Sequence, residues 1–104
     1  MTNHATETNQ GSVDRLFLKT AHRTPMAAAD SVTAEAGHGL LGDISFGRTK
    51  RQVLLVESET LEEFGLGAGE IRENITTRNI RLAGTPIGTR IRAGETLLEV
   101  TMDC

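Results

Sequence analysis

The sequence predicts a small, mostly β domain with one or two short helices. Its apolar residues come in short runs, and these runs are rich in residues that favour strands. Glycine accounts for 11 of the 104 residues and separates the runs, with no alternation of parallel strands and helices. Five or six short strands joined by such turns are typical of a small barrel or an open β-sandwich. The length is that of one domain.

The N-terminal part divides into a tail and a first strand. Residues 1–12 are polar, and we expect a disordered tail followed by a domain over residues 13–104. The apolar residues 16–18 predict a strand, which ends before a turn at Pro25. The next segment is mixed, because three alanines favour helix and Ser31-Val32-Thr33 favours strand. We expect a strand over residues 31–36.

The middle of the chain predicts a loop, a buried strand and a short helix. Three glycines in residues 37–42 indicate an irregular loop with positive φ angles. Four consecutive apolar residues in the segment 52–56 predict a strand buried on both faces. Ser58 is the expected N-cap of a helix of about two turns, which Gly65 ends. Leu61 and Phe64 share one face of this helix.

The C-terminal third predicts further strands. Apolar and basic residues alternate over residues 80–82 and 89–92, which favours short strands. Residues 93–95 read as a hairpin turn. The final strand, residues 96–102, alternates as well and is expected to be half-buried.

Composition and charge exclude several classes of protein. The net charge of −3 argues against a non-specific nucleic-acid binder, and no apolar run is long enough to cross a membrane. The first residues lack the basic and apolar regions of a secretory signal. The single cysteine, Cys104, forms no internal disulfide framework. We therefore expect a cytoplasmic protein.

Generic motifs point to little chemistry. The three histidines and Cys104 match no zinc pattern, and neither a Gly-x-Ser-x-Gly elbow nor a phosphate-binding Gly-Lys-Ser/Thr loop is present. His38, between two glycines, either faces a pocket or lies on a solvated loop. Arg48, Lys50 and Arg51 form a basic cluster, which either holds an anion or flanks the following strand.

Five segments taken in order resemble the MOSC domain, the family named after the C-terminal domain of molybdenum cofactor sulfurase. They are residues 39–43 (GLLGD), 51–57 (RQVLLVE), 72–77 (RENITT), 80–82 (IRL) and 94–101 (GETLLEVT). The resemblance implies a mostly β, barrel-like fold. It also implies binding of the molybdenum cofactor (molybdopterin), with the chain acting as a sulfur carrier or as a cofactor-binding domain. Family members are sulfur transferases or molybdenum-dependent reductases.

The resemblance also implies roles for individual residues. Asp43 and Asn74 would hydrogen-bond the pterin edges, and Arg51 would pair with its phosphate. The remaining cofactor-binding candidates are Gly42, Gln52, Glu73 and Thr76. Cys104 is the candidate catalytic residue and metal ligand, because a thiolate suits molybdenum and persulfide chemistry. The implied partners are the pterin cofactor and a desulfurase or a molybdoenzyme. Pyridoxal phosphate, which belongs to a separate desulfurase domain, is not expected.

The chain departs from the family pattern at its C-terminus. The family domain continues past the matched final strand, and its cysteine usually follows that strand in a Pro-Cys pair. We therefore expect a barrel that is incomplete at the C-terminus, with the catalytic role of Cys104 in question. One rival is a non-catalytic β-module that forms a homo-oligomer through its exposed final strand. Another is a general anion-binding protein that uses Arg90 and Arg92.

Overall fold

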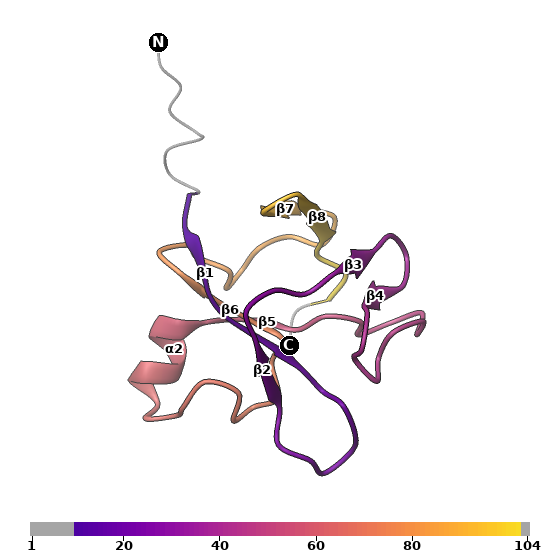
Figure 1. Ribbon diagram of the computed structural model, residues 1–104. Coiled ribbons are helices and arrows are strands. Elements are labelled where there is room, and N and C mark those ends of the chain that lie inside the picture. The colour runs from indigo at the N-terminus through magenta and orange to yellow at the C-terminus, as the bar shows by residue number, and fades with distance from the viewer. Residues whose placement is uncertain (1–9, 103–104) are drawn as a thin grey trace.

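The computed structural model describes residues 10–102, and these residues form a mostly β structure with one short helix, as predicted (Figure 1). Residues 1–9 of the predicted tail and Cys104 lie outside the described residues. The elements are β1 (Ser12–Leu18), β2 (Ala27–Ala29), β3 (Ala34–Glu35), β4 (Gly39–Leu40), β5 (Leu55–Glu57), α2 (Ser58–Glu63), β6 (Ile75–Arg78), β7 (Arg90–Ala93) and β8 (Thr96–Glu99).

The strands form three open sheets. One sheet has four strands in the order β2-β1-β6-β5, and the others are the pairs β3-β4 and β7-β8. Among the described residues, no sheet closes on itself, so the barrel-like shape expected from the resemblance is not seen. Apart from β1, each strand has only two to four residues, which limits how far neighbouring strands can pair.

The main sheet contains a parallel pair that the sequence did not predict. β1 pairs antiparallel with β2 and with β6, with a bulge in the β6 pairing between Val13 and Arg15. β5 and β6 are parallel, with Leu55 opposite Ile75, and α2 lies in the connection between them. The expectation of no parallel unit was wrong because α2 has only six residues, which is too short to show a helical period.

The short helix begins one residue earlier than predicted. Its N-cap is Glu57, so Ser58 is the first helical residue rather than the cap. Gly65 has a φ of 70° just after the C-cap residue and ends the helix as predicted. Leu61 is buried, whereas Phe64 is 70% exposed because the helix ends before it.

Two other strand predictions were wrong, and the C-terminal hairpin was right. The alanine segment is strand β2 because Ala29 pairs with Leu16, and this pairing outweighs the helix propensity of alanine. The expected strand over residues 31–36 is reduced to β3. Residues 80–82 form no strand. β7 and β8 pair around a turn at residues 94–95, but the final strand ends at Glu99 and not at residue 102 as predicted.

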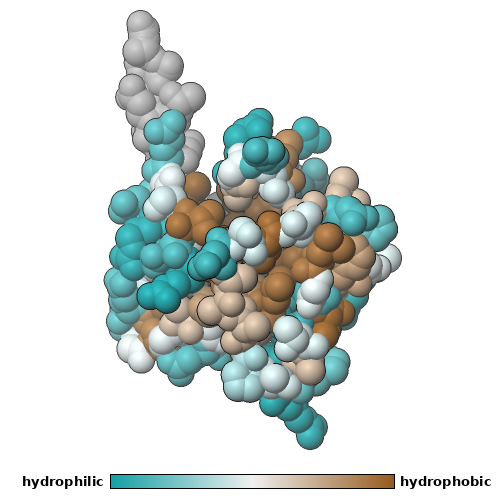
Figure 2. All heavy atoms as spheres, viewed as in Figure 1, coloured by the Kyte–Doolittle hydropathy of each residue, from teal (hydrophilic) through white to brown (hydrophobic). Residues whose placement is uncertain are grey.

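The apolar core is small and lies between the main sheet, α2 and the loop before β5. The buried apolar side chains among the described residues are Phe17, Leu40, Leu61 and Ile75. Residues 53–56 are only half-buried, not buried on both faces, because β5 is at the edge of the sheet. Figure 2 accordingly shows apolar residues across the middle of the visible face. Within residues 10–102, no helix has the length and apolar character needed to cross a membrane.

Candidate functional site

The predicted site residues Asp43 and Asn74 are buried and bonded to each other. Asn74 Nδ2 donates to Asp43 Oδ1 at 3.0 Å and to the carbonyl oxygen of Phe17 at 3.1 Å. Its Oδ1 accepts the backbone N–H of Leu54 at 3.0 Å. Both side chains are about nineteen-twentieths buried, at 6% and 5% exposure. The pair therefore joins β1, the loop after β4 and the segment leading into β5.

Asp43 also orders the loop in which it lies. Its Oδ1 accepts the backbone N–H of Lys19 at 2.6 Å, and its Oδ2 accepts that of Ser45 at 3.0 Å. The second bond closes a local turn of the kind that an aspartate side chain commonly stabilises. The preceding Gly42 has a φ of 89°, a conformation that a side chain rarely adopts. Asp43 and Gly42 thus fix the path of the chain between β4 and β5.

The sequence-predicted basic cluster lies on this ordered segment, which we call the basic loop (residues 37–52). Arg48, Lys50 and Arg51 are all exposed. Within residues 10–102, the ion pairs are formed by Arg78 and Arg90, and none involves these three side chains. The loop therefore presents three cationic groups to solvent with no acidic partner among the described residues.

Gln52 fastens the two ends of the basic loop. Its Nε2 donates to the carbonyl oxygen of Gly37 at 2.9 Å and to that of Arg48 at 2.5 Å. Gly39 has a φ of 107°, and a Cβ added there would lie 3.2 Å from Gln52 Cβ, which is why glycine fits this approach. Arg51 itself has a φ of 57°. Arg23, Arg72 and Asn79 also have positive φ angles, between 60° and 66°, so this conformation does not distinguish Arg51.

An aromatic pair lies on the same loop. The rings of His38 and Phe46 stack with centroids 5.5 Å apart and an interplanar angle of 24°. His38 Nδ1 lies 2.9 Å from the carbonyl oxygen of Ala36, and His38 is exposed. The structure thus places His38 on a solvated loop, the second of the two readings that the sequence left open. Sequence reasoning missed Phe46, which lies eight positions after His38 in the sequence.

The side chains of Glu73 and Thr76 form no hydrogen bond with the basic loop among the described residues. Glu73 is fully buried, and its Oε2 accepts the backbone N–H of Gly69 at 2.5 Å. Among residues 10–102, its Oε1 has no hydrogen-bond partner, and neither does the hydroxyl of the fully buried Thr76. The structure therefore joins Asp43, Asn74 and the basic loop, while Glu73 supports the loop after α2.

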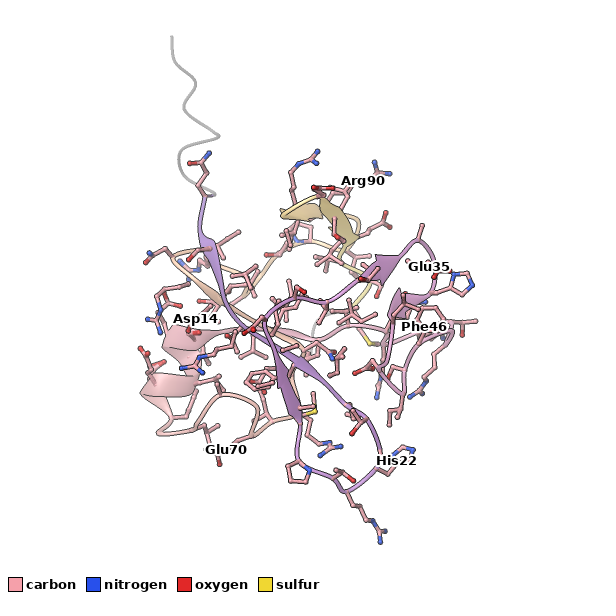
Figure 3. All side chains as sticks on the ribbon, in the orientation of Figure 1. Asp14, His22, Glu35, Phe46, Glu70 and Arg90 are labelled. Carbon is pink, nitrogen blue, oxygen red and sulfur yellow. The ribbon has the colours of Figure 1, made fainter. Side chains whose placement is uncertain are left out.

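A second polar cluster was missed by sequence reasoning and surrounds Asp14. Ser58 Oγ donates to Asp14 Oδ2 at 2.7 Å, and this bond lowers the pKa of Asp14, with Arg78 lowering it further. Glu62 accepts from Arg78 at 2.6 Å and raises the pKa of that guanidinium. In Figure 3, Asp14 beside α2 and Phe46 beside β4 lie on opposite sides of the molecule.

Glu59 belongs to the same side of the molecule as this cluster. Its Oε2 accepts the backbone N–H of Asn79 at 2.8 Å, which lowers the pKa of the Glu59 carboxyl. The contact ties α2 to the segment after β6. Glu59 and the Asp14 cluster therefore hold the helix on the sheet rather than forming part of the basic loop.

Two open grooves on the surface involve other residues. One, of about 360 Å³, is lined by Phe17, Met26 and Arg72 among others, and the second, of about 460 Å³, by Glu57 and Arg81 among others. None of the predicted site residues that the structure describes lines either groove. Within residues 10–102, no three His, Cys, Asp or Glu side chains gather as a metal site would need.

Comparison with known proteins identifies the family. The family model for the MOSC domain matches residues 42–104, which is more than half of the chain. The chain belongs to the MOSC domain family. The match begins at Gly42 and takes in Asp43, Asn74 and the cationic part of the basic loop. Membership points to a function related to the molybdenum cofactor in general. No curated protein and no solved structure matches the chain.

Proposed function

We propose that this MOSC domain binds the molybdenum cofactor and holds its phosphate with the basic loop. The observation that carries the proposal is the pairing of family membership with three exposed cations that have no acidic partner among the described residues. These cations lie on a segment that a buried hydrogen-bonded pair holds in place. The chain has a net charge of −3, and Arg48, Lys50 and Arg51 form no ion pair among the described residues, so their positive charge is available to an anion.

Arg51 is the proposed phosphate ligand. Its guanidinium forms a planar fork that matches two phosphate oxygens, and Lys50 and Arg48 add positive charge nearby in the sequence. Gln52, the next residue, is held by two carbonyl oxygens. These contacts hold the backbone on either side of Arg51, whose side chain is exposed.

Asp43 and Asn74 are proposed to act by positioning. Their internal hydrogen bonds hold the basic loop against β1 and the segment before β5. Gly42 supplies the backbone conformation that this arrangement requires. Direct contact of Asp43, Asn74, Glu73 or Thr76 with the pterin stays a prediction. Glu73 Oε1 and Thr76 Oγ1 have no hydrogen-bond partner among the described residues, but both side chains are fully buried, so the surface of the folded chain does not offer them to a ligand.

The bound cofactor would supply a dithiolene-held molybdenum for sulfur transfer or for reduction. We propose Cys104, which lies outside the described residues, as the thiolate that carries sulfur or binds the metal. A desulfurase or a molybdoenzyme would then be the partner, in a reducing cytoplasm and without pyridoxal phosphate on this chain. Alkylation of Cys104 by iodoacetamide well above the glutathione rate would support the role, and labelling at or below that rate would argue against it.

Cofactor retention tests the proposal. The chain is mixed anaerobically with molybdenum cofactor released from a molybdoenzyme, desalted, and assayed for molybdenum and for oxidised pterin fluorescence. We expect near-stoichiometric retention by the native chain and about tenfold weaker binding by Arg51→Ala, the effect of losing roughly 1.5 kcal/mol of charge-assisted hydrogen bonding. Arg92→Ala is the matched control, because Arg92 is also exposed and forms no ion pair among the described residues. Equal losses in both variants would exclude Arg51 as the specific ligand.

A further inference from the structure

The outer edge of strand β8 is free among the described residues. β8 pairs with β7 alone, in a two-stranded sheet at the margin of the molecule (Figure 1). Val100 donates its N–H to the carbonyl oxygen of Thr89 and accepts the N–H of Gly88, both at 2.8 Å. The polar groups of Val100 therefore face the β7 side.

Backbone polar groups alternate in direction along a strand. Those of Leu98 thus face β7 like those of Val100, and those of Leu97, Glu99 and Thr101 face outward. A second strand placed there would find backbone N–H and C=O groups already aligned for pairing.

β8 is short, which limits pairing, but its edge lacks other features that usually prevent strands from pairing. Residues 96–102 contain no proline and no lysine, and β8 pairs with β7 in continuous register without a bulge. Leu97 is 49% exposed and Met102 39% exposed. A strand edge with exposed apolar side chains and few charges is a template for association.

We propose that β8 pairs antiparallel with β8 of a second copy of this chain, about a twofold axis through Leu98. In this register, Leu97 lies opposite Glu99 of the other copy, and Thr96 lies opposite Val100. The outward-facing backbone N–H and C=O groups of Leu97 then pair with those of Glu99 in the other copy, and those of Glu99 pair with those of Leu97 in the other copy. The two hairpins join into a four-stranded antiparallel sheet in the order β7-β8-β8-β7.

Charge selects this register from its neighbours. Moving the axis by one residue to Leu97 places Glu95 opposite Glu99, and moving it to Glu99 places the two Glu99 side chains opposite each other. Like charges directly opposite destabilise a sheet. With the axis at Leu98, each Glu99 faces a leucine and keeps its own cross-strand contact with Arg90, which is 3.8 Å away in the hairpin.

The expected dimer is weak. Pairing along one short strand buries less than the roughly 1,200–2,000 Å² of a stable interface. We therefore expect a dimer that dissociates on dilution, with a dissociation constant of about 10–500 μM. This inference does not depend on cofactor binding, since β7 and β8 share no residue with the basic loop.

Substitutions at Leu97 test the register with opposite signs. Leu97→Glu places like charges opposite each other twice in the dimer, whereas Leu97→Lys places opposite charges there. Leu97→Pro removes an outward N–H without removing a β7–β8 hydrogen bond. Thr60→Glu, at an exposed position on α2, is the control for the added negative charge. Sedimentation equilibrium from micromolar to millimolar protein measures association, and circular dichroism on the dilute monomer checks folding.

We expect the native chain and Thr60→Glu to have the same dimer dissociation constant. Leu97→Glu and Leu97→Pro should raise this constant by at least about tenfold. Leu97→Lys should leave it unchanged or lower it. If Leu97→Glu fails to fold, the proline and lysine variants still test the proposed pairing of β8 with β8. A native chain that stays monomeric at about 1 mM would overturn the proposal. So would a dimer unaffected by all three variants, or one that Leu97→Lys weakens as much as Leu97→Glu.

Discussion

Removal of the Asn74 side chain should destabilise the protein more than any exposed substitution. Asn74→Ala deletes three hydrogen bonds, to Asp43 Oδ1, to the Phe17 carbonyl and from the Leu54 N–H. Each bond contributes about 1 kcal/mol net, and buried partners left unpaired add to the loss, so we expect about 3–4 kcal/mol. Urea unfolding monitored by circular dichroism measures this change, with Glu63→Ala, an exposed helix residue, as a control expected within about 0.5 kcal/mol.

Asn74→Asp gives the same prediction a dependence on pH. This variant keeps the shape but places a carboxylate beside Asp43, where the native donor lies 3.0 Å from Asp43 Oδ1. Like charges raise the pKa of one member of such a pair in the folded state. The penalty is therefore present at pH 7 and relieved as the pH falls through the raised pKa. The stability gap between Asn74→Asp and the native chain should narrow between pH 7 and about pH 5. A gap that widens, or an Asn74→Ala loss below about 1 kcal/mol, would refute the role assigned to the pair.

Three further predictions concern other parts of the molecule. Ser58→Ala should raise the pKa of Asp14, measured by NMR titration, because the Ser58 hydroxyl is the main cause of its lowered value; an unchanged titration would contradict this. The stabilisation from Asp14 should be present above its ordinary pKa of about 4 and be lost as the pH falls through the lowered value, a loss that Ser58→Ala should reduce in urea unfolding. Gly69→Ala should lower the free energy of unfolding, because φ is 88° and the added Cβ would lie 3.3 Å from the Phe17 ring. Gly47→Ala, with φ 87° and no atom near the added Cβ, measures the backbone cost alone. Equal losses of unfolding free energy in the two variants would show that the ring contact is unimportant.

The sequence predicted secondary structure best where apolar and polar residues alternate regularly over a short segment. The β7–β8 hairpin was predicted because apolar and polar residues alternate on both sides of a glycine turn. The parallel pairing of β5 with β6 could not be predicted, since α2 has only six residues and the pairing joins Leu55 to Ile75 across the chain. Nor could β2, because sheet pairing with β1 outweighs the helix propensity of its alanines.

The resemblance named candidate site residues, but the sequence did not predict how these residues contact one another. The resemblance singled out Asp43 and Asn74, which the structure joins although 31 positions separate them. Their hydrogen bonds to backbone groups of Phe17 and Leu54 depend on the tertiary fold, which no local pattern encodes. Adjacent residues also have partners in different parts of the fold, because Glu73 accepts the Gly69 N–H whereas Asn74 donates to Asp43.

The most direct test of the proposed function measures the coupling between Arg51 and the phosphate of the pterin. Binding of a phosphorylated pterin and of its dephosphorylated form is measured for the native chain and for Arg51→Ala, giving a double-mutant cycle. We predict that removing the phosphate weakens binding to the native chain by at least about tenfold and weakens binding to Arg51→Ala clearly less, because only Lys50 and Arg48 remain in that variant. Equal effects of phosphate removal on both proteins would contradict the assignment of the basic loop as the phosphate site.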